Sequence, residues 1–238
     1  WKVFLDDLRT HLNEKGWFEK TYLGVNENPL DYTLAAVKVI NDHSPDWKIT
    51  YAGNWHSELD GLLDDYSFLY GHEPGMEEVK ARSERGFTST YYVCCNPAKP
   101  NNFLFSPPAE GRWMSWYASA YGYDGFLRWA YDAWPADPMR DARHTLWPAG
   151  DCFLVYPGGN SSIRFEKLRE GIVDYEKIRI LKEMAAGSQE KGVKELISKL
   201  DRHLASFTTE QEFREENIRR AVAEGNALLA ELSDLLAK

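Results

Sequence analysis

Stretches that suit strands alternate with helical stretches through the first 130 residues, and this alternation limits the folds open to the chain. Five segments are predicted as strands, at about residues 21–26, 48–53, 66–71, 87–94 and 125–130. Helices are predicted over residues 2–15, from Asp31 onward, and over residues 76–85 and 109–121. Strands that alternate with helices are typical of a parallel sheet with crossover helices. The sequence therefore predicts an α/β fold.

Polar or aromatic residues follow each predicted strand. These clusters are Asn26-Glu27, Asn54-Trp55-His56, His72-Glu73, Asn96 and Tyr131-Asp132. In a (β/α)8 barrel the carboxyl ends of the strands carry the chemistry. The recurring clusters therefore favour a TIM-type barrel over an open sheet, although five strands do not close a barrel of eight.

A long loop rich in proline and glycine follows the fifth predicted strand and runs to about residue 162. Loops of this length usually carry or cover a functional site. Three helices are predicted after it, from Ser161 or Ser162 to about 186, over 189–205 and over 210–237. The last helix has an apolar stripe, formed by Ile218, Val222, Leu228 or Leu229, Leu232 and Leu236. We expect a partial barrel over residues 1–160 and C-terminal helices that pack on it over residues 161–238.

Composition and motifs exclude several protein classes. The formal net charge of −9 argues against a nucleic-acid partner or an anionic membrane. No apolar run approaches the roughly 18 residues of a membrane-spanning helix. The chain has no GxGxxG, Walker or GxSxG motif, and its six histidines form no HxH or HxxxH pair, so we expect no cofactor and no catalytic metal. Its three cysteines do not make a disulfide framework.

Four stretches together resemble one enzyme family. They are FLDDLRTHLNEKGWFEKTYLGVNENP, ITYAGNW, GFLRWAYDAWPADP and GDCFLVYPGGNSSIRFEKLREGIVDYE. They are similar to the C-terminal part of the catalytic region of glycoside hydrolase family 123, whose characterised members are β-N-acetylgalactosaminidases. The resemblance implies the C-terminal part of a (β/α)8 barrel, a carbohydrate substrate and an extracytoplasmic location. It also implies a partner for the open sheet edge, either a missing upstream half of the barrel or a second copy.

The resemblance assigns the catalytic pair to Asn26 and Glu27. In the family, the 2-acetamido oxygen of the substrate attacks the anomeric carbon, which is an exception to the two-carboxylate scheme. A Glu protonates the leaving oxygen and then activates water, and an adjacent Asp orients the acetamide and offsets the charge of the oxazolinium ion. Glu27 matches the Glu, whereas Asn26 stands where the family has Asp. Asn26 can accept the acetamide N–H but supplies no full charge.

This departure leaves several interpretations open. The chain could be a weakened hydrolase, an enzyme whose substrate lacks the 2-acetamido group, or an engineered variant. A non-catalytic glycan-binding barrel is the alternative from another class. Asp132 is a candidate for the charge that Asn26 lacks.

Aromatic faces stack on sugar rings and polar groups bind sugar hydroxyls, so the strand ends supply candidate substrate contacts. These candidates are Asn54, Trp55, His72, Tyr91, Trp129, Tyr131, Asp132, Trp134 and Asp151. Packing in the core is the alternative role for each aromatic residue. Trp129 and Tyr131 share strand parity, so we expect them to face the same side. Salt bridges that hold the long loop are expected from Arg164, Glu166, Arg169 and Asp174.

Overall fold

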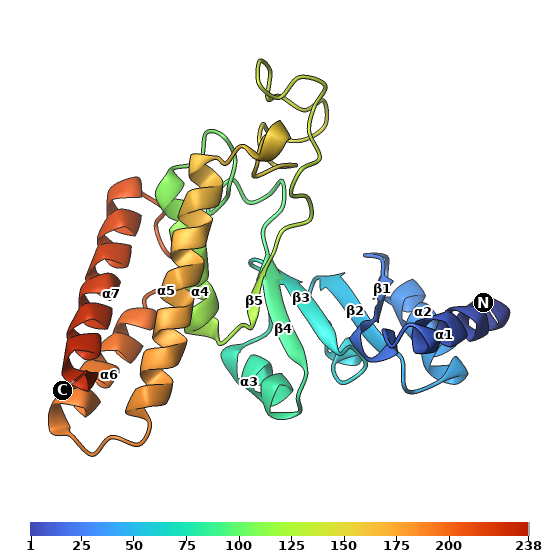
Figure 1. The fold of residues 1–238 in the computed structure, drawn as a ribbon, viewed down its shortest axis with the longest axis horizontal. Helices are drawn as coiled ribbons and strands as arrows, with labels where there is room; N and C mark the ends of the chain where they lie inside the picture. The colour runs from blue at the N-terminus through green and yellow to red at the C-terminus, as the bar shows by residue number, and fades with distance from the viewer. Residues whose placement is uncertain (238) are drawn as a thin grey trace. The chain divides into compact units, whose positions relative to one another are not determined.

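The structure, a computed structural model, describes residues 1–237 (Figure 1). Its strands form one sheet in the order β1-β2-β3-β4-β5, so neighbouring strands are consecutive in sequence. The strands are β1 (Tyr22–Val25), β2 (Lys48–Gly53), β3 (Asp65–Leu69), β4 (Thr88–Tyr92) and β5 (Gly125–Leu127). The helices are α1 (Lys2–Glu14), α2 (Leu30–His43), α3 (Met76–Glu84), α4 (Pro108–Tyr121), α5 (Ile163–Ala185), α6 (Lys191–Leu204) and α7 (Glu215–Leu236). The predicted α/β fold of parallel strands and crossover helices is confirmed.

The chain divides into two compact units, Trp1–Tyr91 and Tyr92–Lys238. The boundary predicted near residue 160 separates barrel from C-terminal helices, and it stays a prediction. Within residues 1–237, no helix combines the length and the apolar composition needed to cross a membrane.

The first unit has a small core between its N-terminal helix and the sheet. Leu5 and Leu12 lie two helical turns apart on α1, so both face the same way. They form one buried cluster with Phe18 and Trp47, whose ring centroids lie 4.8 Å apart. Leu23 on β1 is partly buried and packs against this cluster, so the cluster supports the strand that carries the candidate catalytic pair at its end.

A buried arginine joins α3 to the rest of the first unit. Arg82 is fully buried, and it donates to the Leu63 carbonyl at 3.0 Å and to Ser89 Oγ at 3.1 Å. Its Nη1 lies 3.1 Å from the Asp60 carboxylate. Burial lowers the pKa of Arg82, and Asp60 opposes that shift. Arg82 is therefore an internal anchor of α3.

The second unit is built around stacked aromatic residues. Trp116 stacks on Phe207 with centroids 5.5 Å apart, and Trp113 stacks on Tyr117 at 5.2 Å. Trp113 donates its indole N–H to Gln211 at 2.9 Å. The apolar stripe of α7 is buried at Ile218, Val222, Leu229 and Leu232. It packs against α4, α5 and α6, which lie beside it in Figure 1.

Asp174 on α5 links this helix to α4. It is 1% exposed and accepts bonds from Arg112 Nε at 2.5 Å and Trp116 Nε1 at 2.9 Å. Gly171, one turn earlier, lets α5 approach α4 closely, because a Cβ there would lie 2.6 Å from Ser115 Oγ. Asp174 is therefore paired with Arg112 on α4, whereas a salt bridge that holds the long loop was expected.

The observed elements differ from the predicted ones mainly at their ends. The fifth strand stops at Leu127 rather than at residue 130, and the last helix begins at Glu215 rather than at residue 210. The helix predicted from Asp31 onward begins at Leu30, after Pro29, with no side-chain cap bond. Asp31 lies in the first turn, where a carboxylate complements the helix dipole. Ser162 does cap α5, and its Oγ accepts the Phe165 N–H at 3.2 Å.

Candidate active site

The turn after β1 carries Asn26 and Glu27, and both side chains are exposed. Asn28 Nδ2 donates to the Asn26 carbonyl at 3.4 Å, and Thr33 Oγ1 donates to the Asn28 carbonyl at 3.3 Å. Pro29 then ends the turn and leads directly into α2. The strand, the turn and the first turn of the helix thus fix the backbone that bears Glu27.

Two tyrosines that the sequence analysis did not single out lie near Glu27. Tyr51 on β2 and Tyr66 on β3 are paired in register, and their ring centroids lie 5.3 Å apart. Burial raises the pKa of Tyr51, the charge of Glu27 adds to that rise, and a hydrogen bond with Thr33 opposes it. Burial also raises the pKa of Tyr66, with a small contribution from Glu27. The register of β1 and β2 is the signal that could have found Tyr51.

The loops after β2 and β3 bring three candidate substrate contacts together. Tyr66 donates its hydroxyl to the Asn54 carbonyl, and the Trp55 N–H donates to the His72 carbonyl at 3.0 Å. The Trp55 ring lies 5.7 Å from both Tyr66 and Phe68. Asn54 and His72 are exposed and Trp55 is half-buried, so these side chains stay available for a ligand.

Tyr91 is fully buried, and its ring centroid lies 6.4 Å from that of Tyr70. Of the two roles considered for the aromatic candidates, this burial favours packing.

In the second unit, the segment after β5 lies antiparallel to residues 152–155. Asp132 forms a bridge with Phe153, and the Leu154 N–H donates to the Tyr131 carbonyl at 2.8 Å. Trp134 donates its indole N–H to the Val155 carbonyl at 2.7 Å. Asp132, Tyr131 and Trp134 remain exposed, so the segment presents two rings and one carboxylate to solvent.

The parity argument for Trp129 and Tyr131 is wrong. Because β5 ends at Leu127, neither residue lies on a strand. The Trp129 ring contacts Trp147 at a centroid distance of 5.9 Å, whereas the Tyr131 ring contacts Phe165 at 5.7 Å. Both rings are about half exposed, at 47% and 48%. Each ring is still exposed enough to contact a sugar, but the two rings pack against different aromatic residues.

Asp151, which was predicted to contact the sugar, forms a salt bridge with Arg128. It is fully buried, and its Oδ1 lies 2.6 Å from Arg128 Nη2. Arg128 also donates to the Val93 carbonyl at 3.1 Å, which links the loops after β4 and β5. Burial lowers the pKa of Arg128, and Asp151 opposes that shift. The sequence analysis missed Arg128, although it lies within one of the motifs.

Arg164 and Asn101 also hold these loops by hydrogen bonds to backbone carbonyls. Arg164 Nη1 donates to the carbonyls of Asn102 and Gly150, at 2.7 and 2.8 Å. Asn101 Nδ2 donates to the carbonyls of Cys94 and Pro97, at 2.8 and 2.7 Å. Arg164 therefore holds the loop, as expected, but through backbone carbonyls rather than a salt bridge. Glu166 and Arg169 do pair with each other, at 2.9 Å.

Glu110 on α4 adds a buried carboxyl to this support. It is fully buried, and its Oε2 accepts the Asn101 N–H at 2.8 Å. Burial raises the pKa of Glu110 to about 7, the Asn101 N–H and Lys99 oppose the rise, and Glu215 adds to it. Glu110 therefore titrates near neutral pH in the folded chain.

This titration predicts how stability changes with pH. Between the ordinary glutamate pKa of about 4.3 and a folded pKa of about 7, the folded state keeps a proton that the unfolded state has lost. The free energy of unfolding should therefore fall as pH rises through this window, by about 4 kcal/mol in total. Glu110→Gln should remove this part of the pH dependence, as measured by urea denaturation at pH 5 and pH 8. An unchanged difference between the two pH values would assign the effect elsewhere.

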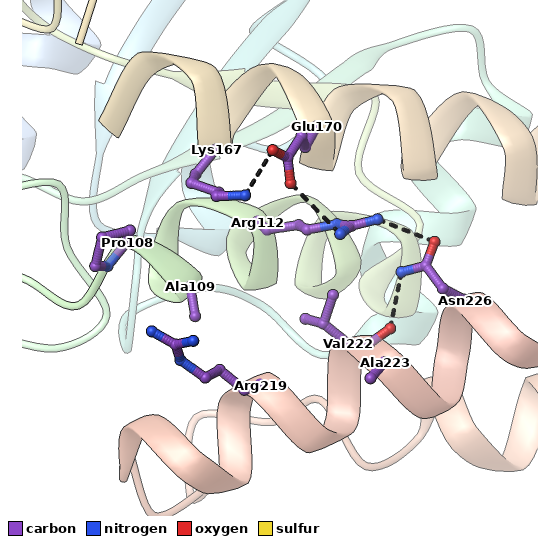
Figure 2. Close-up of a pocket in the computed structure, with 9 residues that line it drawn as sticks. All are labelled: Pro108, Ala109, Arg112, Lys167, Glu170, Arg219, Val222, Ala223 and Asn226. Atoms are coloured by element: carbon purple, nitrogen blue, oxygen red, sulfur yellow. Dashed lines mark hydrogen bonds and ion pairs between the residues drawn. The ribbon is translucent and has the colours of Figure 1, made fainter. Parts of the chain in front are cut away.

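A cavity of about 420 Å³ lies among α4, α5 and α7, and none of these candidates lines it (Figure 2). Arg112 and Lys167 both contact Glu170, at 3.4 and 2.6 Å, and Arg219 is paired with Glu215. Because each cation that lines it already has an acidic partner, the cavity offers no uncompensated charge to a ligand.

The chain is similar to known proteins of one enzyme family. The family model for glycoside hydrolase 123, catalytic domain, matches residues 1–181. Among solved structures, a family 123 glycoside hydrolase from Clostridium perfringens, analysed for glycolipid glycan hydrolysis, is 28% identical with a TM-score of 0.81. The match covers 100% of this chain and 44% of that one, so this chain spans less than half of that enzyme. No curated protein sequence matches the chain.

The similarity confirms the fold expected from the sequence, the C-terminal part of a (β/α)8 barrel followed by a helical region. The match of the family model over residues 1–181 includes the strand that ends in Asn26 and Glu27. The chain therefore belongs to glycoside hydrolase family 123.

Proposed function

We propose that this chain acts on a hexosaminide-type glycan by substrate-assisted, retaining hydrolysis, with Glu27 as the general acid and base. The observation that carries the proposal is the match of the catalytic-domain model over residues 1–181. The matched residues include Glu27, which is exposed and lies just after the end of a strand. Strand ends are where barrel enzymes hold their catalytic groups. The similar clostridial enzyme hydrolyses glycolipid glycans, and this supports a glycan of that kind as the substrate.

In the proposed reaction, the acetamido oxygen of the substrate forms a bond to the anomeric carbon while the glycosidic bond breaks. Glu27 gives its proton to the leaving oxygen, which restores a neutral alcohol. It then takes a proton from the water that opens the oxazolinium ion, so the anomeric configuration is retained. Trp55, which belongs to the same unit as Glu27, is the proposed contact for the sugar.

Asn26 weakens this scheme at one step. A carboxylate at this position would offset the positive charge that develops on the acetamide, and a neutral amide does not. The Asn26 side chain is exposed, and because only the acetamido route develops a positive charge on the acetamide, the deficit falls on that route alone.

Asn26→Asp should raise kcat on an aryl 2-acetamido glycoside by at least about tenfold, which is about 1.4 kcal/mol of barrier. The matched aryl glycoside with a plain 2-hydroxyl cannot form an oxazoline, so its kcat should not rise comparably. Measuring kcat for both substrates with both proteins tests the proposal. If Asn26→Asp slows an existing activity on the 2-hydroxyl substrate, the substrate class lies outside the hexosaminides.

The second candidate is a non-catalytic glycan-binding barrel, and the specific observation for it is Asn26 itself. In that case the protein would bind the sugar, and acetamido hydrolysis would stay at zero in both forms. A partner is also proposed: β1 and β5 end the sheet, and an unpaired edge offers backbone groups to a second copy or another barrel segment.

A further inference from the structure

The loop after β2 places Trp55 against two aromatic residues of β3. Tyr66 and Phe68 lie two positions apart on β3, so their rings project from the same face of the sheet. Both side chains are fully buried, and their ring centroids lie 4.5 Å apart. The centroid of the Trp55 ring lies 5.7 Å from each of them, and Trp55 itself is half-buried. Part of the indole is thus packed on a buried aromatic floor, and the rest is open to a ligand.

The Tyr66 hydroxyl holds the backbone on both sides of Trp55. It donates to the Asn54 carbonyl, and it accepts the His56 N–H at 3.2 Å. A phenol carries one donor hydrogen and can also accept, so these two bonds use both capacities of one group. Burial raises the pKa of Tyr66, so the hydroxyl keeps the proton that it donates. One buried oxygen therefore fixes the residue before Trp55 and the residue after it.

The backbone of Trp55 itself is bonded to the loop after β3. The Trp55 N–H donates to the His72 carbonyl at 3.0 Å. The Asn54 carbonyl, the Trp55 N–H and the His56 N–H thus all have partners outside the segment that they belong to. These partners lie on β3 or shortly after it, in the same compact unit as Glu27. The loop therefore holds the indole in one place within that unit.

We propose that Tyr66 is a positioning residue, whose hydroxyl holds the Asn54–His56 loop and so fixes the Trp55 ring as a platform for the sugar. The proposal rests on the proposed function for the contact between Trp55 and the sugar, but the bracing of the loop does not depend on it. A ring that is already fixed loses little entropy when a sugar stacks on it. Such a contact is made equally before and during the reaction, so it acts on KM rather than on kcat.

Tyr66→Phe is the direct test, because it removes the hydroxyl and keeps the ring beside Trp55. KM for an aryl 2-acetamido glycoside should rise about tenfold, and kcat should stay unchanged. The matched control is Tyr175→Phe on α5, which removes a hydroxyl that donates to the Tyr123 carbonyl at 2.7 Å. It deletes the same kind of bond outside the loop, so both constants should stay as they are. Thermal unfolding checks that both variants fold.

A double variant tests whether Tyr66 acts through Trp55. Trp55→Ala alone should raise KM by at least about tenfold, because it removes the platform. Adding Tyr66→Phe to Trp55→Ala should raise KM no further, since the loop then has no ring to place. A hydroxyl that acted independently of the indole would raise KM by the same factor with and without Trp55.

Hydrogen exchange in the free protein gives a measurement that needs no substrate. The acceptor of the Trp55 amide is the His72 carbonyl, which Tyr66→Phe leaves in place. If the hydroxyl braces the loop, the Trp55 amide should exchange faster in Tyr66→Phe and at the wild-type rate in Tyr175→Phe. Faster exchange of the His56 amide alone would show only that this amide had lost its own acceptor.

The outcomes separate the two proposals. Unchanged KM in Tyr66→Phe, a loss of kcat in place of the rise in KM, independent effects in the double variant, or a wild-type exchange rate at Trp55 would each overturn the positioning role. If the wild-type protein hydrolyses no glycoside, the proposed function fails, and dissociation constants for a methyl 2-acetamido glycoside take the place of KM. If the protein does not bind that glycoside either, exchange at Trp55 alone decides whether Tyr66 braces the loop.

Discussion

Glu27→Gln should lower the hydrolysis of glycosides with poor leaving groups by about 10²–10⁴-fold, the usual contribution of general acid catalysis. Activated aryl glycosides should lose much less in their first step, because a good leaving group departs without protonation. The amide has about the same size as the carboxyl group, but it cannot give up the proton that the leaving oxygen needs. Steady-state rates on one alkyl and one nitrophenyl glycoside of the same sugar provide the measurement.

The control for this variant is Glu77→Gln, which removes an exposed carboxyl from the first turn of α3. It should leave both rates as they are. Equal losses on the two substrates after Glu27→Gln would show that Glu27 does not protonate the leaving oxygen.

Arg128→Met should destabilise the chain by about 3–5 kcal/mol, because it leaves the buried Asp151 carboxylate without its counter-ion. The side chains of Arg128 and Asp151 are 6% and 1% exposed, so water cannot replace the lost partner. Urea denaturation at neutral pH measures the loss. Adding Asp151→Asn should recover part of it, since the uncompensated charge is then gone.

A pair in the same region provides the comparison. Arg143 and Asp141 lie at the same separation, 2.6 Å, with side chains 83% and 49% exposed. Arg143→Met should therefore change the stability little, as is usual for surface pairs. Similar losses in Arg128→Met and Arg143→Met would contradict the view that burial decides the effect.

Local pattern was enough to locate the elements of this fold. The helix over residues 2–15 and a helix that starts at Ser161 or Ser162 follow from adjacent residues, and both were predicted. The end of β5 was not, because Arg128 and Trp129 continue the composition of a strand while their partners lie in loops. A strand ends where its hydrogen bonds end, and those depend on distant segments.

The same limit applies to the candidate site. Glu27 could be selected because it lies in a motif of family 123, but Asp151 could not be recognised as buried. Its partner Arg128 is 23 residues away, and the burial of both depends on packing of the loops. Tyr51 required the register of β1 and β2, which is a tertiary property.

The stacked indoles of the second unit have a practical consequence for spectroscopy. Trp113 and Trp116 are fully buried, each against other rings at fixed angles, and each donates its N–H to a single acceptor. Rigid, closely coupled chromophores give strong near-ultraviolet circular dichroism, and that signal vanishes once the rings rotate freely. A denaturant titration that follows both this band and the far-ultraviolet signal would show whether the packing around α4 is lost together with the secondary structure or before it.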